Sequence, residues 1–87
     1  MADISNSLQK TDPLFQFGRR LVALRQGRGW SQEKLALESG LARSYLSEVE
    51  RGIRNIALLN ICRLADTLGL EPAELLQWPQ KMDRGNV

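Results

Sequence analysis

The sequence predicts an all-α protein that folds into one compact domain of five helices. Apolar residues recur three and four positions apart along most of the chain, which is the spacing of one face of a helix. Glycine, proline or serine stands between these stretches, at positions where helices begin and end. No run of β-branched residues and no Asn-Gly pair indicates a strand or a hairpin. The 87 residues are enough for one small domain with a modest core.

We expect three segments along the chain. Residues 1–12 are polar and show no periodicity, so they are expected to form a flexible N-terminal arm. Residues 13–79 would hold the helices and, towards their C-terminal end, a surface for dimerisation. Residues 80–87 would form a tail.

The first helix is expected to begin at Pro13, because proline suits the first helical turn and Thr11 or Asp12 can cap it. The Gly-Arg-Gly sequence at residues 27–29 would end it. Its apolar stripe would consist of Phe17, Leu21 and Leu24.

The second helix would begin after Ser31, a good N-cap, and end at Gly40, which can adopt the left-handed conformation of a helix C-terminus. The third helix would follow over residues 42–51 and end at Gly52. The residues of these two helices that are expected to face inward are Leu35, Ala36, Leu46 and Val49.

The fourth helix is expected over roughly residues 57–68, with Gly69 as its cap. The Glu-Pro pair at 71–72 would open a short fifth helix that runs to about Gln77, before the Trp-Pro pair at 78–79. The apolar stripe of the fourth helix would consist of Leu58, Ile61, Leu64, Ala65 and Leu68. Cys62 is expected in the core or at its edge.

The second and third helices have the spacing of a helix-turn-helix. Ala36 is small enough for two helices to cross closely, and Gly40, four residues later, suits the tight turn. Leu41 would fill the turn, and Leu46 and Val49 would hold the third helix against the second. An ordinary helical hairpin within a bundle is the alternative.

The outward face of the third helix supplies the candidates for reading DNA bases. Arg43 lies in the first turn, where a guanidinium can bridge O6 and N7 of guanine. Ser44 and Ser47 can contact base edges or phosphates. Glu48 can accept a hydrogen bond from cytosine or repel a wrong sequence. Plain surface roles remain the alternative for these side chains.

The charge distribution fits a polyanionic partner. The net charge of the whole chain is only +2, but residues 17–55 contain eight basic and four acidic residues, a net charge of +4. The segments on either side each contain one more acidic than basic residue. A solvated basic face is the alternative explanation of this pattern.

The composition argues against an enzyme. The chain has no histidine, the commonest general base, and its single cysteine cannot make a usual zinc site without one. We therefore expect no catalytic residue, no metal, no cofactor and no small-molecule ligand. No run of 18 apolar residues and no signal-peptide pattern is present, so we expect a cytoplasmic protein without a membrane partner.

Three motifs then establish a resemblance: LRQGRGWSQEKLA, SGLARSYLSEVERG and ALLNICRLADTLGL. With them, residues 17–76 resemble the lambda-type repressor and Cro-like helix-turn-helix family. Within that family, LARSYLSEVERGIRNIALLNI is most similar to the controller proteins of restriction–modification systems. The resemblance implies a lambda-repressor-like fold, with a helix-turn-helix formed by helices 2 and 3.

The resemblance also implies roles for individual residues. Gln32 stands where the family has a glutamine that binds a DNA phosphate, and Arg43 stands at the base-reading position of the controller proteins. Arg25 and Glu50 match a buried ion pair between the first and third helices. Asn55 matches a loop residue that meets the DNA backbone.

Further backbone contacts are expected from the position of residues next to the third helix. Arg51 and Arg54 would bind phosphates, and the Tyr45 hydroxyl would lie near one. Ala57 departs from the family pattern, because serine is usual there. Its missing hydroxyl removes one possible cap for the fourth helix and one possible phosphate contact.

The function that follows is a sequence-specific transcriptional regulator that binds double-stranded DNA as a homodimer. A (pseudo)palindromic operator is expected, because one recognition helix makes too few contacts for useful specificity. Control of a restriction–modification system is one form of this function. The alternative is an antitoxin-like or adaptor module whose main partner is a protein. The expected dimer interface consists of Leu70, Leu75, Leu76 and Trp78.

Overall fold

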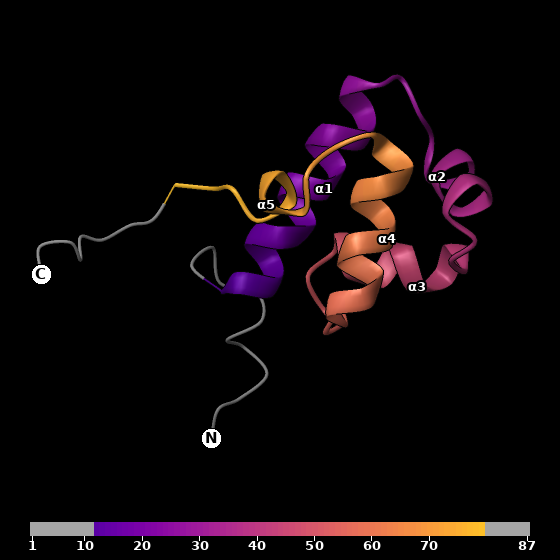
Figure 1. Cartoon of the computed structure of the whole chain (residues 1–87). Helices are drawn as coiled ribbons and strands as arrows, with labels where there is room; N and C mark the ends of the chain where they lie inside the picture. Colours follow the sequence, from indigo (N-terminus) through magenta and orange to yellow (C-terminus); the bar gives the residue numbers. More distant parts are fainter. Residues whose placement is uncertain (1–11, 80–87) are drawn as a thin grey trace, which may run out of the picture.

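The computed structural model of the protein describes residues 12–79, which form five α-helices and no strand (Figure 1). The all-α prediction is therefore confirmed. The expected tail, and the expected arm except for its last residue, lie outside the described residues. The helices are α1 (Pro13–Gly27), α2 (Gln32–Ser39), α3 (Arg43–Glu50), α4 (Leu58–Leu68) and α5 (Pro72–Leu75).

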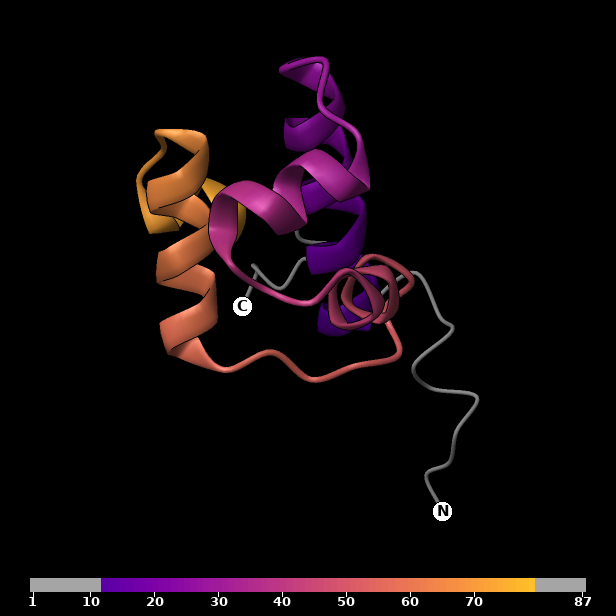
Figure 2. The same ribbon diagram turned by 90° about the vertical axis from the view of Figure 1, so that its right-hand side faces the viewer.

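The five helices surround one core. Helix α1 packs against α3 and α5, and α4 packs against α2 and α5. Figure 2 shows α2 running across the view while α3 is seen nearly along its axis, so the two helices cross instead of lying side by side. This is the arrangement of a helix-turn-helix, and it leaves one side of α3 open.

Every helix contributes a leucine without exposed surface to the core. Burial of such a side chain stabilises the fold by about 1.5–3 kcal/mol, so the leucines tie all five helices together. Ala36 and Leu41 pack against this core at the crossing of α2 and α3. The buried apolar residues are Phe17, Leu21, Leu35, Leu46, Val49, Ile61, Leu64, Ala65, Leu68 and Leu75.

The expected caps set the ends of α1 and α2. The Asp12 carboxylate accepts a hydrogen bond of 2.7 Å from the amide of Leu14, and the Ser31 hydroxyl accepts one of 3.0 Å from the amide of Lys34. Gly40 ends α2 in the left-handed conformation, with φ at 79°. The first two caps fix where α1 and α2 begin, and Gly40 fixes where the chain turns from α2 into α3.

Gly18 fixes the distance between α1 and the end of α3. A Cβ atom at this position would lie 2.5 Å from the backbone oxygen of Glu50 and 2.7 Å from that of Val49. The two helices can therefore approach this closely only because residue 18 has no side chain.

Three expectations about the C-terminal half are wrong. Leu58 is 69% exposed and Cys62 is also exposed, so the buried stripe of α4 begins only at Ile61. The periodicity marks a face of the helix, but it does not tell how far neighbouring helices extend along that face. Helix α5 ends at Leu75 instead of near Gln77. None of the helices described is long and apolar enough to cross a membrane.

Candidate DNA-binding surface

The start of α3 presents polar side chains and unpaired backbone donors to solvent. Arg43 and Ser44 are exposed, and Ser47 and Glu48 are partly exposed, whereas Leu46 and Val49 face the core. Ala42, the N-cap residue, makes no side-chain hydrogen bond, and the first turn contains no acidic residue. The positive end of the helix dipole therefore adds to the charge of the arginine.

An open hollow of about 270 Å³ lies where α2 begins and the first two turns of α3 run past it. Gln32 of α2 lines it together with Arg43, Ser44 and Ser47 of α3. The structure thus brings together three of the four base-reading candidates and one backbone candidate. Glu48 does not line this hollow.

Arg43 faces an acidic residue that the sequence analysis did not include. Its Nη1 lies 3.6 Å from a carboxylate oxygen of Glu33 on α2, and both side chains are more than half exposed. Exposed pairs of this kind contribute about 0–1 kcal/mol, so the guanidinium can leave the pair for a base. The crossing of α2 and α3 creates this contact, which no spacing along the sequence indicates.

Glu48 and Tyr45 both contact the loop between α3 and α4. A Glu48 oxygen lies 3.4 Å from Nη1 of Arg54, and the Arg54 guanidinium stacks 5.1 Å from the centre of the Tyr45 ring. Nδ2 of Asn60, at the start of α4, donates a 3.0 Å hydrogen bond to the Tyr45 hydroxyl. Asn60 is thus a further residue that the sequence analysis missed.

The remaining backbone candidates lie beyond the end of α3. Arg51 is exposed, and its Nε donates to the backbone oxygen of Ser47 over 3.4 Å. Asn55 is exposed in the loop that leads to α4. Ala57 caps α4 without a side-chain hydrogen bond, as the missing hydroxyl predicts.

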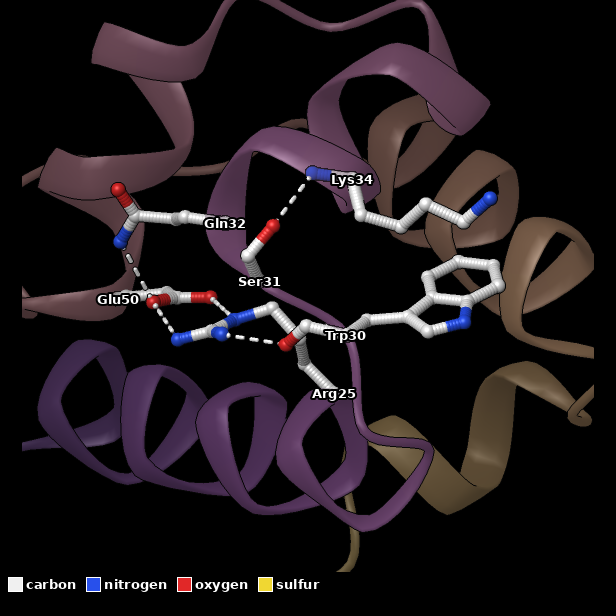
Figure 3. Close-up of polar contacts among 6 residues, drawn as sticks. All are labelled: Arg25, Trp30, Ser31, Gln32, Lys34 and Glu50. Atoms are coloured by element: carbon white, nitrogen blue, oxygen red, sulfur yellow. Dashed lines mark hydrogen bonds and ion pairs between the residues drawn. The ribbon is translucent and has the colours of Figure 1, made fainter.

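A buried ion pair joins α1 to the end of α3 (Figure 3). Nε and Nη2 of Arg25 donate to the two carboxylate oxygens of Glu50 over 2.7 and 2.9 Å, and Nη1 donates to the backbone oxygen of Trp30 over 2.8 Å. The bidentate geometry, together with the hydrogen bonds to Trp30 and Gln32, offsets the free-energy cost of removing the two charges from water. Breaking the pair from one side would leave a buried charge alone.

Gln32 connects this ion pair to the surface. Its Nε2 donates a 2.8 Å hydrogen bond to Oε1 of Glu50, which is only 6% exposed, while Gln32 itself lines the hollow. Figure 3 shows the Gln32 oxygen on the side of the amide that points away from Glu50.

The residues expected at a dimer interface occupy different environments. Leu75 has no exposed surface within one chain, so it belongs to the core and cannot contact a second copy; this part of the prediction is wrong. The reason is that α5 turns this residue towards the other helices. Leu70 and Trp78 are partly buried against the core, and Leu76 is 46% exposed.

A second apolar surface lies on α4. Leu58 and Leu59 are 69% and 80% exposed, and Cys62 is exposed one turn later. Residues three and four positions apart share one side of a helix, so these three form a continuous strip, here called the α4 strip. The sequence alone does not show that these leucines are exposed, because their exposure depends on how α4 packs against the other helices.

The sequence of this chain matches a known protein family. The profile of the helix-turn-helix family HTH_3 matches residues 21–75, more than half of the chain. The control protein C.BamHI of Bacillus amyloliquefaciens is 43% identical to this chain over 63 residues, which make up 71% of this chain and 78% of that protein.

Solved structures agree with the family match. The restriction–modification controller protein C.AhdI from Aeromonas hydrophila has a TM-score of 0.70 and 56% identity, covering 71% of this chain and 94% of that one. The biofilm regulator SinR, solved in complex with DNA, has a TM-score of 0.67 and 31% identity, covering 70% and 98%. These neighbours confirm the predicted lambda-repressor-like fold. The chain therefore belongs to the HTH_3 helix-turn-helix family and is a transcriptional regulator related to the restriction–modification controller proteins.

Proposed function

We propose that the protein binds a specific sequence of double-stranded DNA as a homodimer, by placing α3 in the major groove. The single observation that carries this proposal is the outward face of α3, where Arg43 stands exposed beside an uncapped helix N-terminus. A guanidinium in the first turn of such a helix reaches guanine O6 and N7. Ser44, Ser47 and Glu48 supply further donors and acceptors along the same face.

The flanking residues would hold α3 in register on the duplex. Gln32 lies at the start of α2 and Tyr45 lies in the first turn of α3. Arg51, Arg54 and Asn55 follow the end of α3. Contacts from such positions to phosphates would set the orientation of the domain without reading sequence. The surplus of basic residues in this part of the chain supports the assignment.

A homodimer would double the contact surface and require a (pseudo)palindromic operator with half-sites about one helical turn, or about 34 Å, apart. The α4 strip is our first choice for the dimer contact, because Leu59 is the most exposed of the large apolar residues described. Leu76, on the chain segment after α5, is the exposed member of the surface expected from the sequence and would extend the contact.

Within this function, we assign the protein to the control of a restriction–modification system, acting in the cytoplasm. The support is that C.BamHI and C.AhdI are named as control or controller proteins and match most of their length. An antitoxin-like or adaptor module would need a surface that binds another protein. No observation on residues 12–79 favours another protein over a second copy of this chain as the partner of the exposed apolar surfaces.

Selection from random duplexes, read out by sequencing, tests the proposal. The expected result is an enriched palindrome with guanine at one step of each half-site, together with a dimer in analytical ultracentrifugation. Binding without any sequence enrichment would contradict the base-reading role of α3. An enriched single half-site with a monomeric protein would contradict only the homodimer.

A further inference from the structure

One carboxylate oxygen is shared between the buried ion pair and the surface. Oε1 of Glu50 accepts from Nη2 of Arg25 over 2.9 Å and from Nε2 of Gln32 over 2.8 Å. The carboxylate is fixed from the other side, because Nε of Arg25 donates to Oε2 over 2.7 Å. Glu50 thus has a single position, and Gln32 is bonded to that position.

The chemistry of the partner settles which way the Gln32 amide lies. An ionised carboxylate only accepts hydrogen bonds, whereas an amide has a donating and an accepting end. The end of Gln32 that faces Glu50 must therefore be the NH₂ group. Its carbonyl oxygen then faces away from Glu50, as Figure 3 shows, and one amide hydrogen remains for another partner.

We infer that Glu50 is a positioning residue for DNA binding, which acts through Gln32 by holding its amide in one orientation at the hollow. This inference rests on the proposed function, in which Gln32 contacts the DNA. The hollow is otherwise lined by Arg43, Ser44 and Ser47 of α3. The second amide hydrogen of the held Gln32 can donate to a phosphate beside them, whereas its carbonyl oxygen can only accept.

Holding Gln32 in place would raise DNA affinity because a glutamine side chain is flexible. A free glutamine at the surface samples many rotamers and both amide orientations, and binding would have to restrict them. Fixing one flexible side chain during binding weakens affinity about two- to tenfold. In this protein the hydrogen bond to a buried and charged acceptor already orders Gln32 before DNA arrives. DNA binding therefore does not have to restrict this side chain. The ion pair thereby serves affinity in addition to stability.

The free protein provides the first test. In the side-chain amide region of a proton–nitrogen NMR spectrum, one of the two Gln32 hydrogens is expected to be shifted downfield and to exchange slowly with water. The exposed Gln26 at the end of α1 is the internal control. Exchange of both Gln32 hydrogens at the rate of Gln26 would overturn the inference without any variant.

The second test measures DNA affinity in a double-mutant cycle. Replacing Arg25→Met and Glu50→Leu together removes the anchor of Gln32 but leaves no buried charge alone, so the fold is expected to persist. This pair of changes should weaken binding to the selected duplex about two- to tenfold. In a chain that also carries Gln32→Ala, the same pair should change affinity by less than about twofold.

A matched control separates positioning from general loss of an ion pair. Lys34 and Glu38, which both lie on α2, form an exposed ion pair with 3.0 Å between the Lys34 Nζ and a Glu38 carboxylate oxygen. Replacing both by Gln keeps the net charge and should have the same effect on affinity with Gln32 as with Gln32→Ala. If the Arg25 and Glu50 changes also act equally in both chains, Glu50 has only a structural role and the inference falls.

The outcomes also separate the inference from the proposed function. If Gln32→Ala leaves affinity unchanged while Arg43→Ala lowers it, the DNA-binding function stands and the positioning role is refuted. If the unaltered protein selects no sequence at all, the proposed function itself fails. In that case, a slowly exchanging Gln32 amide would report only a structural contact.

Discussion

Glu48 and Arg54 form an ion pair of 3.4 Å that links the outward face of α3 to the loop before α4. The same guanidinium lies over the ring of Tyr45. Glu48 is thus bound to a residue that we assign to the DNA backbone. Its carboxylate competes with phosphate for this arginine, and it carries a charge that DNA repels. This arrangement explains an acid on a face that is otherwise suited to DNA.

Replacing Glu48→Gln should therefore strengthen binding to random duplex more than binding to the operator. On any duplex the change removes the competition for Arg54 and the repulsion of phosphates. On the operator it also replaces the charged acceptor that Glu48 would offer to a cytosine amine by a weaker neutral one, so the gain there is smaller. We expect about a three- to tenfold gain on random DNA, on the scale of about 1 kcal/mol for an exposed pair. Titrations of both duplexes at one salt concentration measure it. An equal gain on both would assign Glu48 no part in specificity.

Replacing Arg43→Ala should weaken binding to the selected operator by about 1–3 kcal/mol and relax the preference at one base step. The side chain is exposed in the first turn of α3, and its only described ion-pair partner is the exposed Glu33. Repeating the selection from random duplexes with the variant identifies the relaxed step. Arg51→Ala is the control, because loss of a phosphate contact should weaken all sequences about equally. Equal loss on operator and random DNA for Arg43→Ala would refute base reading.

The helices could be predicted because local signals and long-range packing agree along most of the chain. Asp12, Ser31 and Gly40 act at helix ends within one turn of their own position, so the sequence is sufficient to identify them. The outward face of α3 follows in the same way from its two core residues, Leu46 and Val49. The four base-reading candidates were available from this periodicity alone.

Contacts between helices could not be predicted by the same means. The pairing of Arg43 with Glu33 and of Tyr45 with Asn60 depends on crossing angles, which no single stretch of sequence encodes. The buried position of Leu75 and the exposure of Leu58 depend on which neighbours cover each turn. Only the resemblance to a known family indicated the pairing of Arg25 with Glu50.

Replacing Gly18→Ala should destabilise the fold by about 1–3 kcal/mol, the usual cost of overpacking. The added Cβ would lie 2.5 Å from the backbone oxygen of Glu50, and backbone atoms cannot move aside as a flexible side chain can. Urea denaturation measures the loss. Gly27→Ala, on the same helix, is the matched control, since nothing lies within 4 Å of its added Cβ. It should be neutral or stabilise the helix by up to about 1 kcal/mol. Similar losses for both variants would refute the close approach.

Replacing Leu59→Glu should raise the dissociation constant of the dimer at least about tenfold, because a charge would enter an apolar contact between two copies. Sedimentation equilibrium across a range of concentrations measures it. Leu37→Glu on α2 is the matched control, since Leu37 is equally exposed but lies outside the α4 strip, and it should leave the dimer intact. Leu76→Glu tests the C-terminal surface separately. If only Leu76→Glu dissociates the dimer, the contact lies after α5, and the α4 strip is free to face another partner.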